Sequence, residues 1–112
     1  LYAFTADSKK HAQIWDLKNG EQVSRLKYLH RQEVFSAVRF SEDGKRLLTG
    51  APTRKLTLWN TQNGKAVAEW RVTPRKNVRP KGAVVHAVAF LDDGTVLSES
   101  SSGLAEQWIV PD

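Results

Sequence analysis

Few side chains in this sequence are suited to catalysis or to metal binding. The histidines are His11, His30 and His86, which are far apart along the chain, and no two of them have metal-ligand spacing. The lack of cysteine excludes a thiol nucleophile, a disulfide and a thiolate metal site. Asp92 and Asp93 are adjacent carboxylates, but a glycine follows them and they fit a hairpin turn better than an acid–base pair. We therefore expect no catalytic residue, no metal ion and no cofactor.

The elements that would position any site are short β-strands. Between residues 34 and 71, four apolar runs follow one another, and they read VFSAVRF, RLLTG, KLTLWN and KAVAEW. The first run places Val34, Ser36, Val38 and Phe40 on one face, with the period of two that is typical of a strand. An Asp-Gly pair follows the first run and an Asn-Gly pair follows the third, and both are strong signals for tight hairpins. This stretch predicts one four-stranded antiparallel meander.

The same pattern is repeated on both sides of this stretch. Trp15 and Trp59 are each followed four residues later by an Asn-Gly pair, which gives a repeat with a spacing of 44 residues. Asp93 and its glycine repeat Asp43 and its glycine at a spacing of 50 residues, and Trp108 takes the place of the earlier tryptophans. The chain therefore predicts three units with three, four and three strands, and no helix.

The bounds of these units follow from the turns between them. Residues 1–27 form a unit that lacks its first strand, residues 34–71 form a complete unit, and residues 84–112 form a unit that lacks its last strand. Residues 72–83 contain two prolines, an asparagine, a glycine and four cationic residues, and this composition predicts an exposed loop.

Three motifs in register resemble the WD-repeat β-propeller family: IWD at 14–16, LWN at 58–60 and QWI at 107–109. The run VRFSEDGKRLLTG is very similar to the first hairpin of a WD repeat, and VAFLDDGTVLSES is a weaker match. The resemblance covers all 112 residues. It implies an all-β fold of WD-repeat-type β-propeller blades, each a four-stranded antiparallel meander. Because propellers have about four to eight blades, three partial units imply an incomplete ring, part of a larger propeller.

The resemblance also implies a hydrogen-bonded set of residues in each blade. An indole N–H can only donate, so a buried tryptophan needs an acceptor. Residues at the position of the family's hydroxyl, ten residues before each tryptophan, are Thr5, Thr49 and Ser98. His30 stands where the family has a histidine, although Leu29 replaces the usual glycine, and the loop aspartate of the family is missing. The residues expected to have structural roles are Trp15, Trp59, Trp108, His30 and Thr49.

Both faces of the strands are apolar. In LTLW, Leu56 and Leu58 point one way while Thr57 and Trp59 point the other. Stacked blades bury both faces, whereas a two-sheet sandwich, the alternative, needs outward polar residues that LLTG and AVAF lack. We expect His86 to be a core histidine and Trp70 to be a packing residue rather than an exposed contact.

The charges differ between the two ends of the predicted strands. Loops between the second and third strands of a blade, and between blades, emerge on one face with a net charge of +7, and the hairpins on the other face carry −3. The cations on the first face are candidates for partner binding, and they are Lys9, Lys10, Arg31, Arg54, Lys55, Arg75, Lys76, Arg79 and Lys81.

These observations favour a non-enzymatic protein–protein interaction or scaffold module, with an acidic protein among the candidate partners. The alternative is polyanion or nucleic-acid binding through the basic face. Nucleic acid is less favoured because Tyr28 is the one aromatic residue in those loops that could stack on bases. No apolar run is long enough to be a transmembrane segment. On its own, such a part of a propeller is expected to self-associate through its uncovered strand edges.

Overall fold

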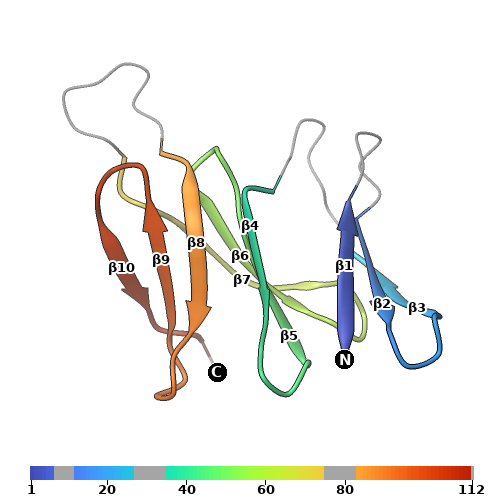
Figure 1. Ribbon diagram of the computed structural model, residues 1–112. Coiled ribbons are helices and arrows are strands. Elements are labelled where there is room, and N and C mark those ends of the chain that lie inside the picture. The colour runs from blue at the N-terminus through green and yellow to red at the C-terminus, as the bar shows by residue number, and fades with distance from the viewer. Residues whose placement is uncertain (7–11, 27–34, 75–82, 112) are drawn as a thin grey trace.

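The computed structural model describes residues 1–6, 12–26, 35–74 and 83–111. Ten strands form three antiparallel sheets, which lie next to one another in chain order (Figure 1). The first sheet contains β1 (Tyr2–Ala6), β2 (Ala12–Asp16) and β3 (Gln22–Arg25). The second contains β4 (Ala37–Phe40), β5 (Arg46–Gly50), β6 (Lys55–Asn60) and β7 (Ala66–Arg71). The third contains β8 (Val85–Phe90), β9 (Val96–Ser100) and β10 (Ala105–Trp108).

The predicted all-β class and the count of three, four and three strands are confirmed, and no helix occurs in the described ranges. In each sheet the strands pair with their neighbours in the chain, as a meander requires. The first strand of the complete unit is shorter than predicted, because β4 begins at Ala37. Just before it, the Ser36 hydroxyl donates to the carbonyl oxygen of Val85, and the Ser36 backbone N–H donates to the carbonyl oxygen of Gly50. Val38 is exposed on this strand rather than buried.

The first two sheets also share a local irregularity. The register shifts between Ile14 and Trp15 where β2 pairs with β3, and between Leu58 and Trp59 where β6 pairs with β7. Such a shift marks a β-bulge, which increases the local twist of a strand pair. The two bulges lie at the same place relative to the tryptophan, so the repeat with a spacing of 44 residues extends to backbone detail.

Two hydrophobic cores lie between the sheets, one at each boundary. Ile14 of β2 and Leu26, which follows β3, pack with Leu47 and Trp59 of the second sheet. On the opposite face of the second sheet, a cluster of aliphatic side chains packs against the third sheet, and its buried members are Leu48, Leu56, Leu58, Val72, Ala83, Val85, Val88 and Val96. β5 and β6 therefore bury both of their faces, as the apolar pattern predicts for stacked blades.

A tryptophan is hydrogen-bonded in each of the three sheets. The indole N–H donates to a hydroxyl oxygen ten residues earlier, at 2.8 Å for Trp15 and Thr5, 2.9 Å for Trp59 and Thr49, and 3.0 Å for Trp108 and Ser98. The hydroxyl acceptors implied by the family resemblance are thus present in all three units. Their proposed partner His30 lies outside the described residues.

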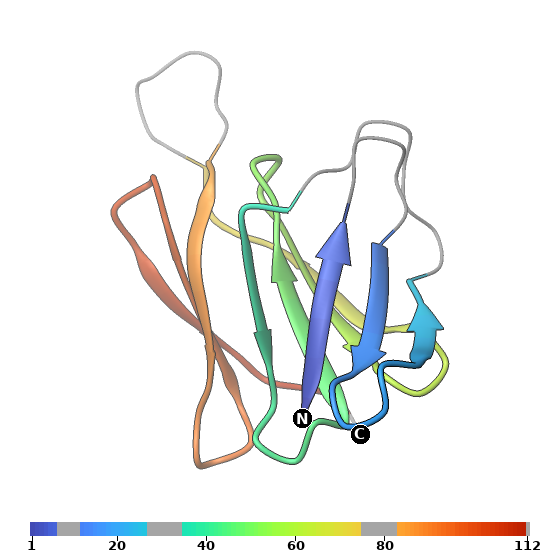
Figure 2. The ribbon, with the colours of Figure 1, turned by 45° about the vertical axis from the view of Figure 1, so that its right-hand side comes forward.

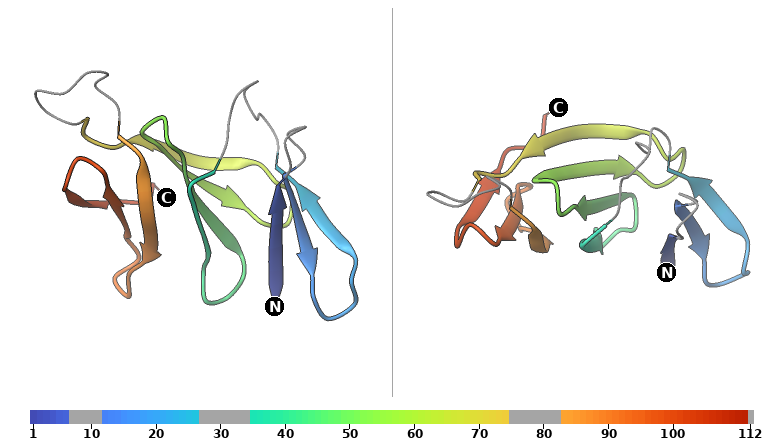
Figure 3. Two further views of the ribbon diagram at one scale, coloured as in Figure 1. Left: turned by 45° about the horizontal axis from the view of Figure 1, so that its top comes forward. Right: turned by 90° about the horizontal axis from the view of Figure 1, so that it is seen from above.

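Seen from above, the sheets fan out, with β8, β4 and β1 on one side of the fan and β7 on the other (Figure 3). Trp70 of β7 is partly buried and packs on Trp108 of β10, with ring centroids 6.2 Å apart, so its predicted packing role is confirmed. His86, by contrast, is exposed, and its prediction as a core histidine is wrong. The cause is a register shift between Val85 and Ala87, which turns His86 out of the alternating pattern.

Candidate interaction surfaces

The strand ends form two opposite faces. The strand ends that flank the connections β1–β2, β3–β4, β5–β6, β7–β8 and β9–β10 lie at one end of the sheets, which we call the loop face (Figures 1 and 2). The hairpins β2–β3, β4–β5, β6–β7 and β8–β9 emerge at the other end, which we call the hairpin face. This is the division of loops that the sequence predicts.

Most of the candidate cations of the loop face lie outside the described residues. These are Lys9, Lys10, Arg31, Arg75, Lys76, Arg79 and Lys81. Arg54 and Lys55 are described, and both differ from the expected picture of free, exposed loop cations.

Arg54 holds the second and third sheets together. Its Nε–H donates to the carbonyl oxygen of Val72 at 2.9 Å, and its backbone N–H donates to the carbonyl oxygen of Ala83 at 3.0 Å. The φ of Arg54 is +71°, a backbone conformation that residues other than glycine rarely adopt. Arg54 therefore contacts both described ends of segment 72–83 through hydrogen bonds within the fold.

Lys55 is the first residue of β6 and is buried. Its Nζ lies 3.5 Å from a carboxylate oxygen of Glu69 on β7. The sequence placed Lys55 both at the start of the predicted strand KLTLWN and among the cations of the loop face, and β6 does begin at Lys55. Because its charge is already paired within the sheet, Lys55 is not a free cation for a partner.

The hairpin face is described completely, and its charges are predominantly negative. Its acidic residues are Asp16, Glu21, Glu42, Asp43, Asp92 and Asp93, and its basic residues are Lys18, Lys45 and Lys65. Apart from Asp16, which is half-buried, all of these side chains are exposed. This face therefore presents a surface with a net charge of −3.

Two turn aspartates on this face have lowered pKa values. The pKa of Asp43 is lowered chiefly by a hydrogen bond from the Ser41 hydroxyl at 2.7 Å, and also by the backbone N–H of Lys45. The pKa of Asp93 is lowered first by the Thr95 hydroxyl and then by the Thr95 backbone N–H. Hydrogen bonds to the charged form favour ionisation, so both carboxylates stay negative over a wide pH range.

We expect the substitution Ser41→Ala to raise the pKa of Asp43 toward its ordinary range and to leave that of Asp93 unchanged. A carboxyl group whose pKa is lower in the folded than in the unfolded state stabilises the fold at pH values above its unfolded-state pKa. This contribution is lost as the pH falls below about 4. Both aspartates are fully exposed, so the effect on stability is small and titration is the sharper measurement. Carboxyl carbon shifts followed by NMR from neutral to acidic pH would measure both pKa values in one sample. An unchanged Asp43 titration in the variant would contradict the role of Ser41.

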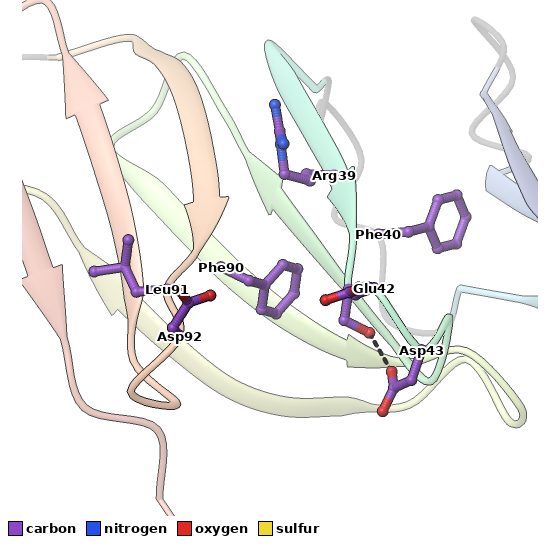
Figure 4. A pocket seen from close by; sticks show the side chains of 8 residues that line it. Arg39, Phe40, Glu42, Asp43, Phe90, Leu91 and Asp92 are labelled. Atoms are coloured by element: carbon purple, nitrogen blue, oxygen red, sulfur yellow. Dashed lines mark hydrogen bonds between the residues drawn. The ribbon is translucent and has the colours of Figure 1, made fainter.

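A cavity of about 630 Å³ lies on this face between the β4–β5 and β8–β9 hairpins. It is lined by Arg39 and Glu42 from the second sheet and by Phe90 and Asp92 from the third, among others. Figure 4 shows the Phe90 ring between the carboxylates of Glu42 and Asp92, while the Arg39 side chain extends away from them. The site thus combines an aromatic surface with carboxylates from two different sheets.

Sequence reasoning assigned Asp92 and Glu42 to turns and did not combine them into a site. The signal was nevertheless present, because Asp92 follows Glu42 at the same spacing of 50 residues that relates Phe90 to Phe40. Equivalent positions on adjacent blades lie side by side when the blades stack. No group of residues suited to holding a metal ion occurs in the part of the chain that the structure describes.

Comparison with known proteins identifies the fold and nothing further. No family model and no curated protein sequence matches the chain. The structure of the computationally designed Ika4 protein matches 98% of this chain with a TM-score of 0.70 and a sequence identity of 16%. That of the computationally designed Ika8 protein matches 97% of this chain with a TM-score of 0.73 and a sequence identity of 17%. The fold is that of stacked β-propeller blades. The chain spans 61% of the Ika4 chain and 30% of the Ika8 chain. Among the described residues there is no helix able to span a membrane.

Proposed function

We propose that this chain is a non-enzymatic protein-interaction or scaffold module, built from WD-repeat-type blades, that binds partners through its charged faces. The observation that carries the proposal is the separation of charge between the two ends of a well-packed stack of sheets. Solvation of loops accounts for charge at both ends, but it does not account for opposite signs. With Lys55 left out because it lies in β6, the loop face carries a net charge of +6 in the sequence and the hairpin face −3.

Membership of the WD-repeat family is supported by three motifs and by the hydrogen bonds at the motif tryptophans. The IWD, LWN and QWI motifs each contain a tryptophan that donates to a hydroxyl ten residues earlier. Such a repeated hydrogen bond is what the family resemblance implies. The fold alone does not specify a function, so the interaction role rests on the surfaces and not on the family.

The loop face suits an acidic protein partner. Long cationic side chains at a surface make individually weak contacts that salt screens. Several of them acting together favour association with a surface of opposite charge. The outer faces of the first and third sheets have no neighbouring sheet among the described residues, which supports the expectation that the chain also self-associates.

Reversal of four loop charges tests this proposal. We expect the combined substitution of Arg75, Lys76, Arg79 and Lys81 by Glu to reduce binding to poly-L-glutamate at least about tenfold at low salt, because it changes the net charge of the face by eight. Folding should persist, as judged by circular dichroism, since the predicted loop contributes few buried contacts. Unchanged binding in the folded variant would show that the charge separation is incidental.

A nucleic-acid arm of the same experiment addresses the alternative function. Double-stranded DNA carries a dense array of phosphates, so its binding to a cationic face falls steeply with salt. If DNA binds far more tightly than poly-L-glutamate, and the four reversals abolish that binding, the polyanion function replaces the protein partner. If DNA and poly-L-glutamate bind comparably, simple charge attraction explains both and a protein partner remains the proposal.

A further inference from the structure

We infer that the cavity between the β4–β5 and β8–β9 hairpins binds a positively charged side chain, preferably the guanidinium of an arginine, presented by a protein partner. This inference rests on the proposed function as an interaction module and names the chemistry of one partner group. The Glu42 and Asp92 carboxylates come from neighbouring sheets, and the Phe90 ring lies between them (Figure 4).

The two carboxylates are available for a ligand. Both side chains are exposed, and within the described ranges neither of them has a hydrogen bond or an ion pair. Arg39 is the one cation among the residues that line the cavity, but its side chain extends away from the two carboxylates (Figure 4). The site therefore has uncompensated negative charge that a ligand cation would neutralise.

The aromatic ring favours an organic cation over a metal ion. The Phe90 ring is partly exposed at the cavity, and the face of an aromatic ring attracts a cation within about 6 Å of its centre. The volume of about 630 Å³ accommodates a long side chain. In the part of the chain that the structure describes, no set of ligands suited to a metal ion is present.

Arginine fits this combination better than lysine. Its planar guanidinium stacks on an aromatic face and donates several hydrogen bonds in the plane of the group. The edges of a guanidinium stacked on Phe90 then donate to the carboxylates that line the same cavity. A lysine ammonium is more strongly hydrated and loses more on leaving water.

The probe for this site is N-acetyl-arginine amide, with N-acetyl-citrulline amide as its uncharged isostere. Binding is followed by NMR as shifts of the Glu42, Phe90 and Asp92 signals during titration at low salt. We expect the arginine probe to shift these signals with a saturable curve and the citrulline probe to shift them much less. Equal shifts by both probes, or equal shifts on addition of calcium or magnesium chloride, would overturn the inference.

Matched variants separate the cavity from the general charge of the protein. The double variant Glu42→Gln and Asp92→Asn should bind the arginine probe about tenfold more weakly, because it loses two charge-assisted hydrogen bonds. The control Glu21→Gln and Glu99→Gln removes the same charge from exposed positions that do not line the cavity, and should change affinity less than about twofold. Equal losses in both variants would mean that only long-range charge attracts the probe.

Arg39→Gln gives an effect of the opposite sign. Removing a cation from the cavity wall reduces repulsion of the arginine probe, so we expect about two- to threefold tighter binding. Weaker binding in this variant would contradict the proposed charge arrangement.

The outcome is independent of the loop-face experiment. The four loop-face reversals leave every residue of the cavity unchanged, so that variant should bind the arginine probe at least as well as the original chain. If the probe fails to bind while poly-L-glutamate binding depends on the loop face, this inference is wrong and the proposed function stands. If the probe binds and the loop-face dependence fails, the loop-face part of the proposed function is wrong and the cavity site stands.

Discussion

Substitution of Trp59 by alanine is expected to lower the free energy of unfolding by about 3–5 kcal/mol. The side chain is 2% exposed and packs in the core between the first and second sheets. Its removal leaves a cavity there, and it also deprives the buried Thr49 hydroxyl of its donor. Chemical denaturation followed by circular dichroism would measure the loss.

Trp15→Ala is the matched comparison for this prediction. Trp15 makes the same hydrogen bond to a threonine ten residues earlier, but it is only half-buried because its face of the first sheet has no neighbouring sheet among the described residues. We expect about half the destabilisation, since the hydrophobic contribution scales with the area removed from water. Equal effects of the two substitutions would contradict the packing of the second sheet against the first.

Gly64→Ala is expected to destabilise the chain by about 3 kcal/mol, and Gly20→Ala by about 1 kcal/mol. Both glycines follow an asparagine in a hairpin and have nearly the same φ, +72° and +73°. Both substitutions therefore carry the same strain of a left-handed conformation. A Cβ at Gly64 would lie 1.9 Å from the carbonyl oxygen of Arg25 in the first sheet, whereas a Cβ at Gly20 would meet nothing within 4 Å.

The difference between these two alanine variants isolates the contact between sheets. Since backbone cannot move aside as a flexible side chain can, the second sheet must shift away from the first to admit the methyl group at position 64. Thermal and denaturant unfolding of both variants, side by side, gives the difference directly. If the two variants are equally stable, the β6–β7 hairpin does not contact the backbone of the first sheet.

The strand pattern and the tryptophan hydrogen bonds could be predicted from the sequence because they depend on local spacing. Tight turns with glycine set the hairpins, and the alternation of side chains sets the faces. The acceptors Thr5, Thr49 and Ser98 were implied by the family resemblance. In each sheet the acceptor lies on the neighbouring strand, two residues beyond the residue that pairs with the tryptophan. Repetition made each of these local signals more specific.

The misjudged residues are those whose environment is set by a neighbouring sheet or by an irregularity. Lys55 was grouped with the loop cations that could bind a partner, yet it is buried and paired with Glu69, a residue on the next strand. His86 was assigned to the core, yet a register shift in β8 exposes it. Sequence periodicity does not reveal a bulge. The bulge changes which face a residue such as His86 occupies, but the sequence of apolar and polar residues looks the same with or without it. The cavity at Phe90 was missed because it forms only when two hairpins lie side by side.

Aromatic contacts across the two sheet boundaries report on whether the three sheets stack. Tyr2 and Phe40 join the first and second sheets with ring centroids 6.0 Å apart, and Trp70 and Trp108 join the second and third at 6.2 Å. A nuclear Overhauser spectrum of the folded chain should show cross-peaks between the ring protons of both pairs. If both cross-peaks are absent while contacts within each sheet are present, the sheets do not stack in this order.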